Sequence, residues 1–176
     1  MSRETAALAE YAVGLEYEDI SPAAVERAKD CIIDTVAVSV FGSGLPWSRI
    51  VADCAERSGP GGNATILRPE LSRATPPMAA LANGALSHAF EMDSLRQPSA
   101  GIHPGSALAV PGLAVAEDVG ASGRELITAF VAGSEVLSRI GLAGRHSSEQ
   151  LGFHAPGLTG PFGSAVVAGR LLGLDS

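Results

Sequence analysis

Four histidines occur in this chain, and two of them lie in one stretch, HAFEMDSLRQPSAGIHPGSA, which runs from residue 88 to residue 107. The same stretch contains two carboxylates, Glu91 and Asp93, although only 18% of the chain is charged. Imidazoles and carboxylates are the side chains that most often transfer protons near neutral pH. A packed core does not require them. The stretch is therefore either a site for chemistry or a loop of unusual composition.

Two short segments place a histidine just ahead of a proline and a run of small residues. They are Gly-Ile-His-Pro-Gly-Ser around His103 and Gly-Phe-His-Ala-Pro-Gly around His154, and a helix-like segment follows each. A helix N-terminus presents free N–H groups and the positive end of the helix dipole, which favour a bound carboxylate. If the two helix starts converge, they suit a ligand with several carboxylates. Otherwise the two histidines cap helices or form turns.

Glu91 and Asp93 are two positions apart, so they share a face only if their segment is extended. One of them can serve as a general base. His88 lies three residues before Glu91, so these two side chains pair if the segment is helical. The alternatives are a solvated helix end and a purely structural pair. The spacing of His88, Glu91 and His103 matches no tight zinc signature, so we expect no metal.

Composition narrows the class of protein. The 176 residues are 46% hydrophobic, which is enough for a substantial core, and the net charge is −7. Lys and Arg form no cluster, so we expect no nucleic-acid partner. Cys31 and Cys54 lack metal or disulfide spacing and are expected to pack in the interior. The longest apolar run, residues 102–116, is short for a bilayer and contains Pro111, so we expect no membrane partner and a cytoplasmic protein.

Patterns typical of helices cover most of the chain. Ser21 followed by Pro22 marks one helix start, and Ser122 with Glu125 forms a capping box at another. Residues 64–69 are expected to form a brief strand or an extended link. Helices are predicted over residues 3–15, 22–41, 48–57, 76–90, 104–118, 123–140 and 161–174. The predicted fold is therefore all-α, with about six to eight packed helices in a single domain over residues 1–176.

Four longer segments are similar to those of one enzyme family. ALANGALSHAFEMDS with HPGSALAVPGLAVAE, and GFHAPGLTGPFGSAVVAGRLLGL, resemble the MmgE/PrpD family, and ERAKDCIIDTVAVSVFG resembles its N-terminal helix. That family includes 2-methylcitrate dehydratase and cis-aconitate decarboxylase. The resemblance implies a large helical domain with a smaller α+β lid, arranged as a homodimer. It also implies chemistry without a cofactor, in which a proton is abstracted next to a carboxylate and water or CO2 is lost.

The resemblance assigns roles to particular residues. The acid of the family's His-x-x-Asp pattern corresponds to Glu91, and the histidines of its two turns correspond to His103 and His154. These three are the expected catalytic residues. Leu95 stands where a threonine is common, and Ser94 stands where a second Asp is usual. The expected substrate-binding residues are His88, Asp93, Ser106 and Thr159.

The expected function is thus a hydro-lyase acting on a tricarboxylic acid of the 2-methylcitrate type, or the N-terminal portion of such an enzyme. One alternative is a decarboxylase of the cis-aconitate type, or an epimerase, on the same scaffold. The other is an inactive remnant or a structural subunit that requires a partner chain.

The family's catalytic lysines and lid have no counterpart in these residues, and the single lysine, Lys29, lies in an ordinary helix. We therefore expect an incomplete domain without the lid, and little turnover by these residues alone. We also expect a small polycarboxylate as substrate. The protein partner is expected to be a second copy, forming a dimer, or a complementing second chain.

Overall fold

The computed structural model describes residues 3–97 and 102–175, and nearly all of its regular structure is helical. The helices are α1 (Arg3–Gly14), α2 (Pro22–Gly42), α3 (Pro46–Ser58), α4 (Pro76–Ser87), α5 (Val110–Val119), α6 (Gly123–Gly144), α7 (Ser147–Gln150) and α8 (Ala155–Leu171). A 3-10 turn, η1 (Tyr17–Asp19), and a π-helical turn, η2 (Gly105–Ala109), complete the helical segments. Strands β1 (Ala64–Ile66) and β2 (Ser72–Ala74) form an antiparallel hairpin. The predicted all-α class is confirmed.

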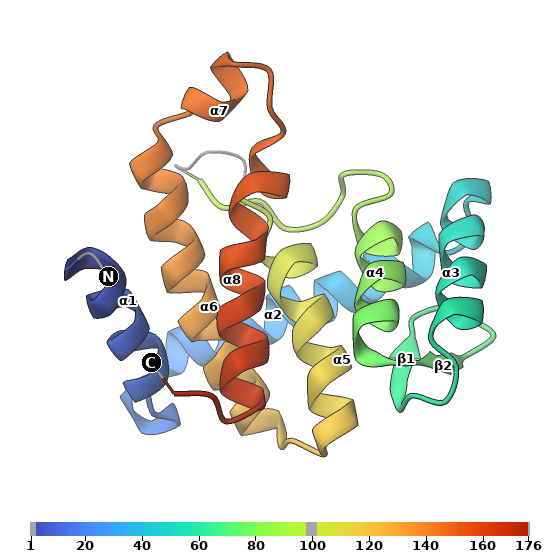
Figure 1. Ribbon diagram of the computed structural model, residues 1–176, viewed down its shortest axis with the longest axis horizontal. Coiled ribbons are helices and arrows are strands. Elements are labelled where there is room, and N and C mark those ends of the chain that lie inside the picture. Colours follow the sequence, from blue (N-terminus) through green and yellow to red (C-terminus); the bar gives the residue numbers. More distant parts are fainter. Residues whose placement is uncertain (1–2, 98–101, 176) are drawn as a thin grey trace.

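Six helices stand side by side in the order α1, α6, α8, α5, α4 and α3 (Figure 1). Helix α2 crosses behind this row, and it contacts α4, α6 and η2. Residues 88–97, which follow α4, pass across one end of the row towards the start of α8 (Figure 1). The loop that carries the candidate site therefore rests on the ends of several helices rather than on one of them.

The capping signals place two helix starts as the sequence predicts. Ser21 Oγ accepts a hydrogen bond from the backbone N–H of Ala24. At the start of α6, the Ser122 N–H donates to Glu125 Oε2, and the Glu125 N–H donates to Ser122 Oγ. The bond from the Ser122 backbone lowers the pKa of Glu125, so this cap stabilises the helix above the ordinary carboxyl pKa and weakens as the pH falls.

The turn η2 is joined to α8 by a side chain that compensates for a proline. In a regular α-helix the Ala107 carbonyl would accept from the N–H of residue 111, but Pro111 has none. Ser164 Oγ, on α8, donates to that carbonyl instead, at 2.7 Å. The departure from α-helical geometry at residues 105–109 therefore has a local cause, and it ties η2 to α8.

Glycines allow α6 and α8 to approach closely around the core. A Cβ on Gly133 would lie 2.6 Å from Val167 Cγ2, and one on Gly163 would lie 2.6 Å from Leu108 Cδ2 and 3.0 Å from Leu137 Cβ. Both distances under 3 Å are shorter than carbon atoms tolerate. Leu108, Leu137 and Val167 are themselves fully buried or nearly so. The interface between these helices therefore has no room for a larger side chain.

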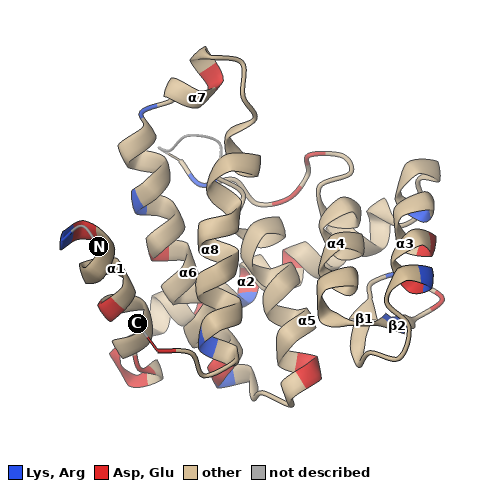
Figure 2. Ribbon diagram, viewed as in Figure 1, with Lys and Arg blue, Asp and Glu red and all other residues tan. Residues whose placement is uncertain are grey.

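Helix α6 is long and apolar enough to cross a membrane by length and composition, and the pair α2–α3 passes the same test together. However, 56% of the most apolar window of α6 is buried inside the fold, and α2 and α3 are bent by 103° at their junction. More than half of the apolar window of α6 therefore packs in the interior of the fold. Charged residues are spread along the chain, but α4 has none and α8 has only Arg170 (Figure 2).

Some predicted boundaries and environments are wrong. The last helix begins at Ala155, not at Pro161, because the proline is accommodated inside the helix. The hairpin has a second strand that the sequence pattern does not reveal. Cys54 is exposed, whereas Cys31 is half-buried.

The close approach of α6 and α8 yields a stability prediction. Gly163→Leu should lower the free energy of unfolding by about 1–3 kcal/mol, because the added side chain must displace buried neighbours. Gly144→Leu is the matched control, since a Cβ at Gly144 meets nothing within 4 Å. It should change stability by no more than about 0.5 kcal/mol. Urea denaturation of both variants measures the difference, and equal losses would contradict the packing described here.

Candidate functional site

The candidate site begins where α4 ends, at a turn with unusual backbone geometry. Ser87 Oγ donates to the Gly84 carbonyl, and the Glu91 N–H donates to the His88 carbonyl. Glu91 has a φ of 51°, a left-handed conformation that is uncommon for residues other than glycine. The turn directs Glu91 outward, with 75% of its side chain exposed, and Asp93 inward, with 0% exposed. The two carboxylates therefore do not share a face.

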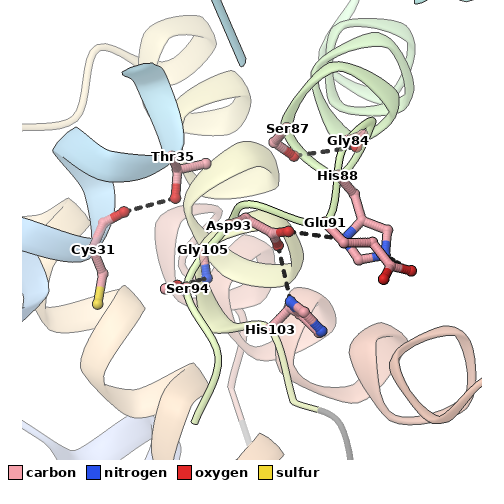
Figure 3. A network of polar contacts seen from close by, with 10 residues as sticks. All are labelled: Cys31, Thr35, Gly84, Ser87, His88, Glu91, Asp93, Ser94, His103 and Gly105. Carbon is pink, nitrogen blue, oxygen red and sulfur yellow. Dashed lines mark hydrogen bonds and ion pairs between the residues drawn. The ribbon is translucent and has the colours of Figure 1, made fainter. Parts of the chain in front are cut away.

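Asp93 lies between two histidines (Figure 3). Its Oδ1 is 2.9 Å from Nδ1 of His88, within hydrogen-bonding distance and geometry. Its Oδ2 is 3.3 Å from Nδ1 of His103, at an ion-pair distance but without hydrogen-bond alignment among the described residues. The two rings meet edge to face, with centroids 4.9 Å apart. A buried carboxylate is costly unless it is paired, and these imidazoles are the groups that contact it.

The turn that carries His103 is held from both sides. The Arg96 N–H donates to the Ile102 carbonyl, and Ile102 is buried. The Gly105 N–H donates to Ser94 Oγ at 3.1 Å. A Cβ at Gly105 would lie 2.3 Å from Thr35 Oγ1 on α2, so only glycine allows this approach. The His-Pro-Gly sequence is thus packed against α2, and that contact fixes the position of His103.

His154 completes the cluster from another element. It is the N-cap of α8, its side chain is exposed, and its ring centroid is 5.7 Å from that of His88. Nε2 of His88 also lies 3.9 Å from Glu91 Oε1. The site therefore brings together three imidazoles and two carboxylates, from the end of α4, the loop after it and the start of α8.

A groove of about 580 Å³ runs from this cluster between α4, η2 and α8. Its polar lining comes from His88, Ser106, His154 and Ser164, and most of the remaining lining is alanine, glycine and proline. Small-molecule sites are typically concave and mostly apolar, with a few converging polar groups. Imidazoles can bind carboxylates and can donate or accept protons, and Glu91 can accept them. The groove is therefore suited to proton transfer on a small anionic ligand.

A second cavity, of about 490 Å³, lies on the other side of the loop, between α2 and α6. Its lining includes Tyr11, Cys31, Ser94 and Phe130, and none of the histidines. Burial raises the pKa of the Cys31 thiol, which keeps it in the unreactive neutral form. The groove that contains the imidazoles is the stronger candidate for chemistry.

Six of the seven predicted site residues lie together. His88, Glu91, Asp93, His103 and His154 form the cluster, and Ser106 lines the groove. Thr159 is the exception, because its hydroxyl donates to the Ala155 carbonyl within α8 and the residue does not line the groove. The roles assigned to these residues stay predictions.

Sequence reasoning did not foresee two polar contacts. One is the position of Asp93 behind the histidines, because the pairing with His103 depends on the path of the loop. The other is Asn83, whose Oδ1 accepts the Leu67 N–H and whose Nδ2 donates to the Thr65 carbonyl, both at 2.8 Å. The Asn-Gly-x-x-x-His segment thus has its asparagine attached to the hairpin and its histidine in the site.

Comparison with known proteins gives consistent matches along the chain. Residues 6–176 match the MmgE/PrpD N-terminal domain. A cis-aconitate decarboxylase of Aspergillus terreus (strain NIH 2624 / FGSC A1156) is 31% identical over 97% of this chain and 36% of that protein. The cis-aconitate decarboxylase-like protein oryM of Aspergillus oryzae is 30% identical, over 97% of this chain and 37% of that protein. The human cis-aconitate decarboxylase is 27% identical, over 93% and 34% respectively. The chain spans about a third of the length of these relatives.

The buried position of Asp93 yields a prediction that does not depend on any activity. Asp93→Ala should lower the free energy of unfolding by about 1–3 kcal/mol, because it leaves two imidazoles without their buried partner. Asp30→Ala is the matched control, since the Asp30 side chain is largely exposed on α2. Chemical denaturation of both variants provides the measurement. If Asp93→Ala is no less stable than Asp30→Ala, the carboxylate does not hold the cluster together.

Proposed function

Because this chain belongs to the MmgE/PrpD family, we propose that it forms the N-terminal part of a lyase that acts on a small tricarboxylic acid. The observation that carries the proposal is the buried Asp93, which contacts His88 and His103 beside a groove that His154 also borders. The relatives reported above are cis-aconitate decarboxylases or similar proteins, which supports this class of substrate. We expect the protein to act in the cytoplasm.

The choice of a polycarboxylate follows from the charges at the groove. The protein carries a net charge of −7, so an anionic ligand needs a local set of donors. His88 and His154 line the groove, and His103 lies against His88 behind them. The N-terminus of α8, which follows His154, adds the positive end of the helix dipole, although Pro156 has no N–H and the Gly157 N–H donates to the His154 carbonyl. Several donors arranged over a short distance suit a ligand with several carboxylates better than one with a single carboxylate.

Decarboxylation is the reaction that we propose first. In it a C–C bond breaks, the electron pair stays on carbon as CO2 leaves, and a proton must then be delivered to that carbon. An imidazolium is a suitable donor, and we assign this role to His103, which Asp93 orients. In this scheme Asp93 acts through the histidines rather than on the substrate. His88, Ser106 and His154 bind the carboxylates, and His103 hydrogen-bonds to the ligand before it gives up its proton.

Dehydration of a 2-methylcitrate-type acid is the second candidate, and the position of Glu91 favours it. Dehydration requires a base to remove a proton from carbon and an acid to protonate the departing hydroxide. Glu91 Oε1 lies 3.9 Å from His88 Nε2, so a carboxylate base and an imidazole acid lie side by side. An assay that follows CO2 release and the appearance of a C=C bond separately, with cis-aconitate, citrate and 2-methylcitrate, distinguishes the two reactions. Epimerisation would change the stereochemistry of the substrate without either signal.

The ligand-binding role of His103 can be measured directly. His103→Ala should weaken binding of citrate or cis-aconitate by about 1.5–3 kcal/mol, the scale of a hydrogen bond to a charged group. That loss corresponds to about a 10- to 150-fold higher Kd by calorimetry. His146→Asn is the control, because His146 lies ahead of α7, pairs with Glu149 and does not line the groove.

The outcomes separate the competing functions. Unchanged affinity in His103→Ala would make His103 a turn residue and remove the donor from the proposed mechanism. Binding without any turnover, in a protein that includes these residues and the complementing segment, would favour the structural-subunit alternative. Absence of binding by every tricarboxylate tested would contradict the proposed substrate class.

We also propose that this chain associates with a second copy through apolar side chains near the groove. Leu81 on α4 and Leu158 and Phe162 on α8 are each about half exposed, and contiguous apolar exposure is a common mark of an interface. Light scattering should show a mass that rises with concentration, and Phe162→Glu should reduce it. Leu71→Glu, at an exposed position beside the hairpin, is the control. A monomer at all concentrations would contradict the proposal.

A further inference from the structure

The cavity of about 490 Å³ between α2 and α6 has no role in the proposed reaction, and it shares no lining residue with the imidazole groove. Figure 3 shows Cys31 and Ser94, which line this cavity, on the opposite side of Asp93 from His88 and Glu91. The volume falls in the range of about 300–1,000 Å³ that is typical of small-molecule sites. The cavity is therefore an independent candidate for a ligand.

Two serines on α6 place unpaired hydroxyls in the wall of this cavity. Ser134 and Ser138 line it about one turn apart, and only 4% of Ser138 is exposed. Thr128 on the same helix donates to the carbonyl four residues before it, as Ser164 does on α8. Within the part of the chain that the structure describes, neither Ser134 nor Ser138 makes a hydrogen bond. Because a buried hydroxyl without a partner is costly, these two groups point to a ligand that supplies an acceptor.

The charged lining of the cavity favours an anion. Arg27 and Arg96 line it, and Glu135, which also lines it, forms an ion pair within α6. Nη1 of Arg27 lies 3.8 Å from Asp30 Oδ2, and both side chains are largely exposed. Because exposed ion pairs contribute little stability, a bound anion can replace Asp30 as the partner of Arg27 at low cost. Burial, followed by the charge of Glu135, raises the pKa of Tyr11, so this phenol stays a neutral hydrogen-bond donor in the wall.

The apolar part of the lining limits the ligand to a single charged group. Most of it comes from α2, α6 and the loop, through Ala24, Ala28, Leu95, Phe130 and Val131. An apolar chain gains free energy when it is buried against such side chains. A second or third carboxylate would lie against them without a partner, which is costly. The cavity therefore suits a different ligand from the tricarboxylic acid proposed for the groove.

We propose that this cavity binds a small monocarboxylate with an apolar chain, of the medium-chain fatty-acid class. The chain packs against Phe130 and Val131, and the carboxylate is bound by arginine and serine side chains of the wall. This site and the lyase site can be tested separately, because binding of a monocarboxylate is measured without any turnover.

A ligand in this cavity contacts the loop that holds the imidazole cluster. Ser94 and Pro104 both line the cavity, and they directly follow Asp93 and His103 in the sequence. Ser94 Oγ also accepts the Gly105 N–H, a bond that helps to hold the turn of His103. The proposed ligand therefore lies against this loop on the face opposite to the groove.

The test titrates the chain with octanoate and, separately, with octanol, and follows both by calorimetry. Octanoate should bind saturably at one equivalent and more tightly than octanol, which lacks the charge. Arg27→Gln should raise the Kd of octanoate about tenfold or more, the scale of a hydrogen bond to a charged group, and leave that of octanol unchanged. Ser134→Leu should abolish saturable binding of both, because the larger side chain fills the cavity.

Arg124→Gln is the matched control for Arg27→Gln. Arg124 is likewise an exposed, ion-paired arginine, but it does not line this cavity, so its loss should not change the Kd of octanoate. Circular dichroism of each variant checks folding, and Arg27→Gln is the decisive variant because its side chain is 78% exposed.

Amide NMR spectra locate the ligand. Octanoate should shift the signals of Ser94 and Phe130 rather than those of Leu81 and Gly157, which line the groove, and citrate should not displace it. The proposal is overturned if octanoate does not saturate, if Arg27→Gln binds it as tightly as the unchanged chain, or if Arg124→Gln weakens it equally. Displacement by citrate, or shifts confined to the groove, would also overturn it.

Discussion

The arrangement of the site depends on one buried carboxylate. Asp93 has no exposed side-chain surface, and its two oxygens face two different imidazoles. An isolated charge at this position would be costly, so the loop is stable only when both histidines are in place. His88 belongs to the end of α4 and His103 to the turn before η2, and the pairing therefore fixes two helices relative to each other as well as two side chains. The polar cluster therefore contributes to the stability of the fold as well as forming the candidate site.

The helical scaffold holds this link through close backbone contacts rather than large side chains. Gly105 approaches α2, and Gly133 and Gly163 allow α6 and α8 to meet. The part of the core around α3, α4 and the hairpin consists largely of alanines, together with Ile66 and Leu86. Small residues permit short distances between helix axes but leave little tolerance for added volume. Other small residues shape the groove, because alanine, glycine and proline dominate its lining.

Local signals in the sequence predicted local structure well. Ser21 with Pro22, and Ser122 with Glu125, mark helix starts because their side chains bond to backbone groups only three residues away. The same approach failed at Pro161, since a proline inside a helix is tolerated where the surrounding packing maintains it. It also missed β2, which is three residues long and is stabilised by its pairing with β1.

In the candidate site, too, the sequence predicted features set by neighbouring residues but not contacts between distant ones. The types of residue that carry chemistry were visible in the sequence, and so were the two turns that bring His103 and His154 to helix starts. The difference between Glu91 and Asp93 was not. One is exposed and the other buried because the backbone at Glu91 adopts a positive φ, and no pattern of alternation specifies that turn. The partner of Asp93 across the loop likewise depends on the path of the intervening chain.

Ser164, in the wall of the groove, has two carbonyl oxygens within hydrogen-bonding distance of its hydroxyl. Its oxygen lies 2.7 Å from the Ala107 carbonyl and 2.9 Å from the Gly160 carbonyl, yet a hydroxyl carries a single hydrogen. The hydroxyl can donate a full hydrogen bond to only one of the two carbonyls at a time, and rotation about the Cβ–Oγ bond of Ser164 switches it from one to the other. Ala107 lines the groove, so one of the two alternative acceptors belongs to a residue of the groove wall. Rotation of this hydroxyl therefore exchanges a hydrogen bond between η2 and α8 for one within α8, and neither helix has to move.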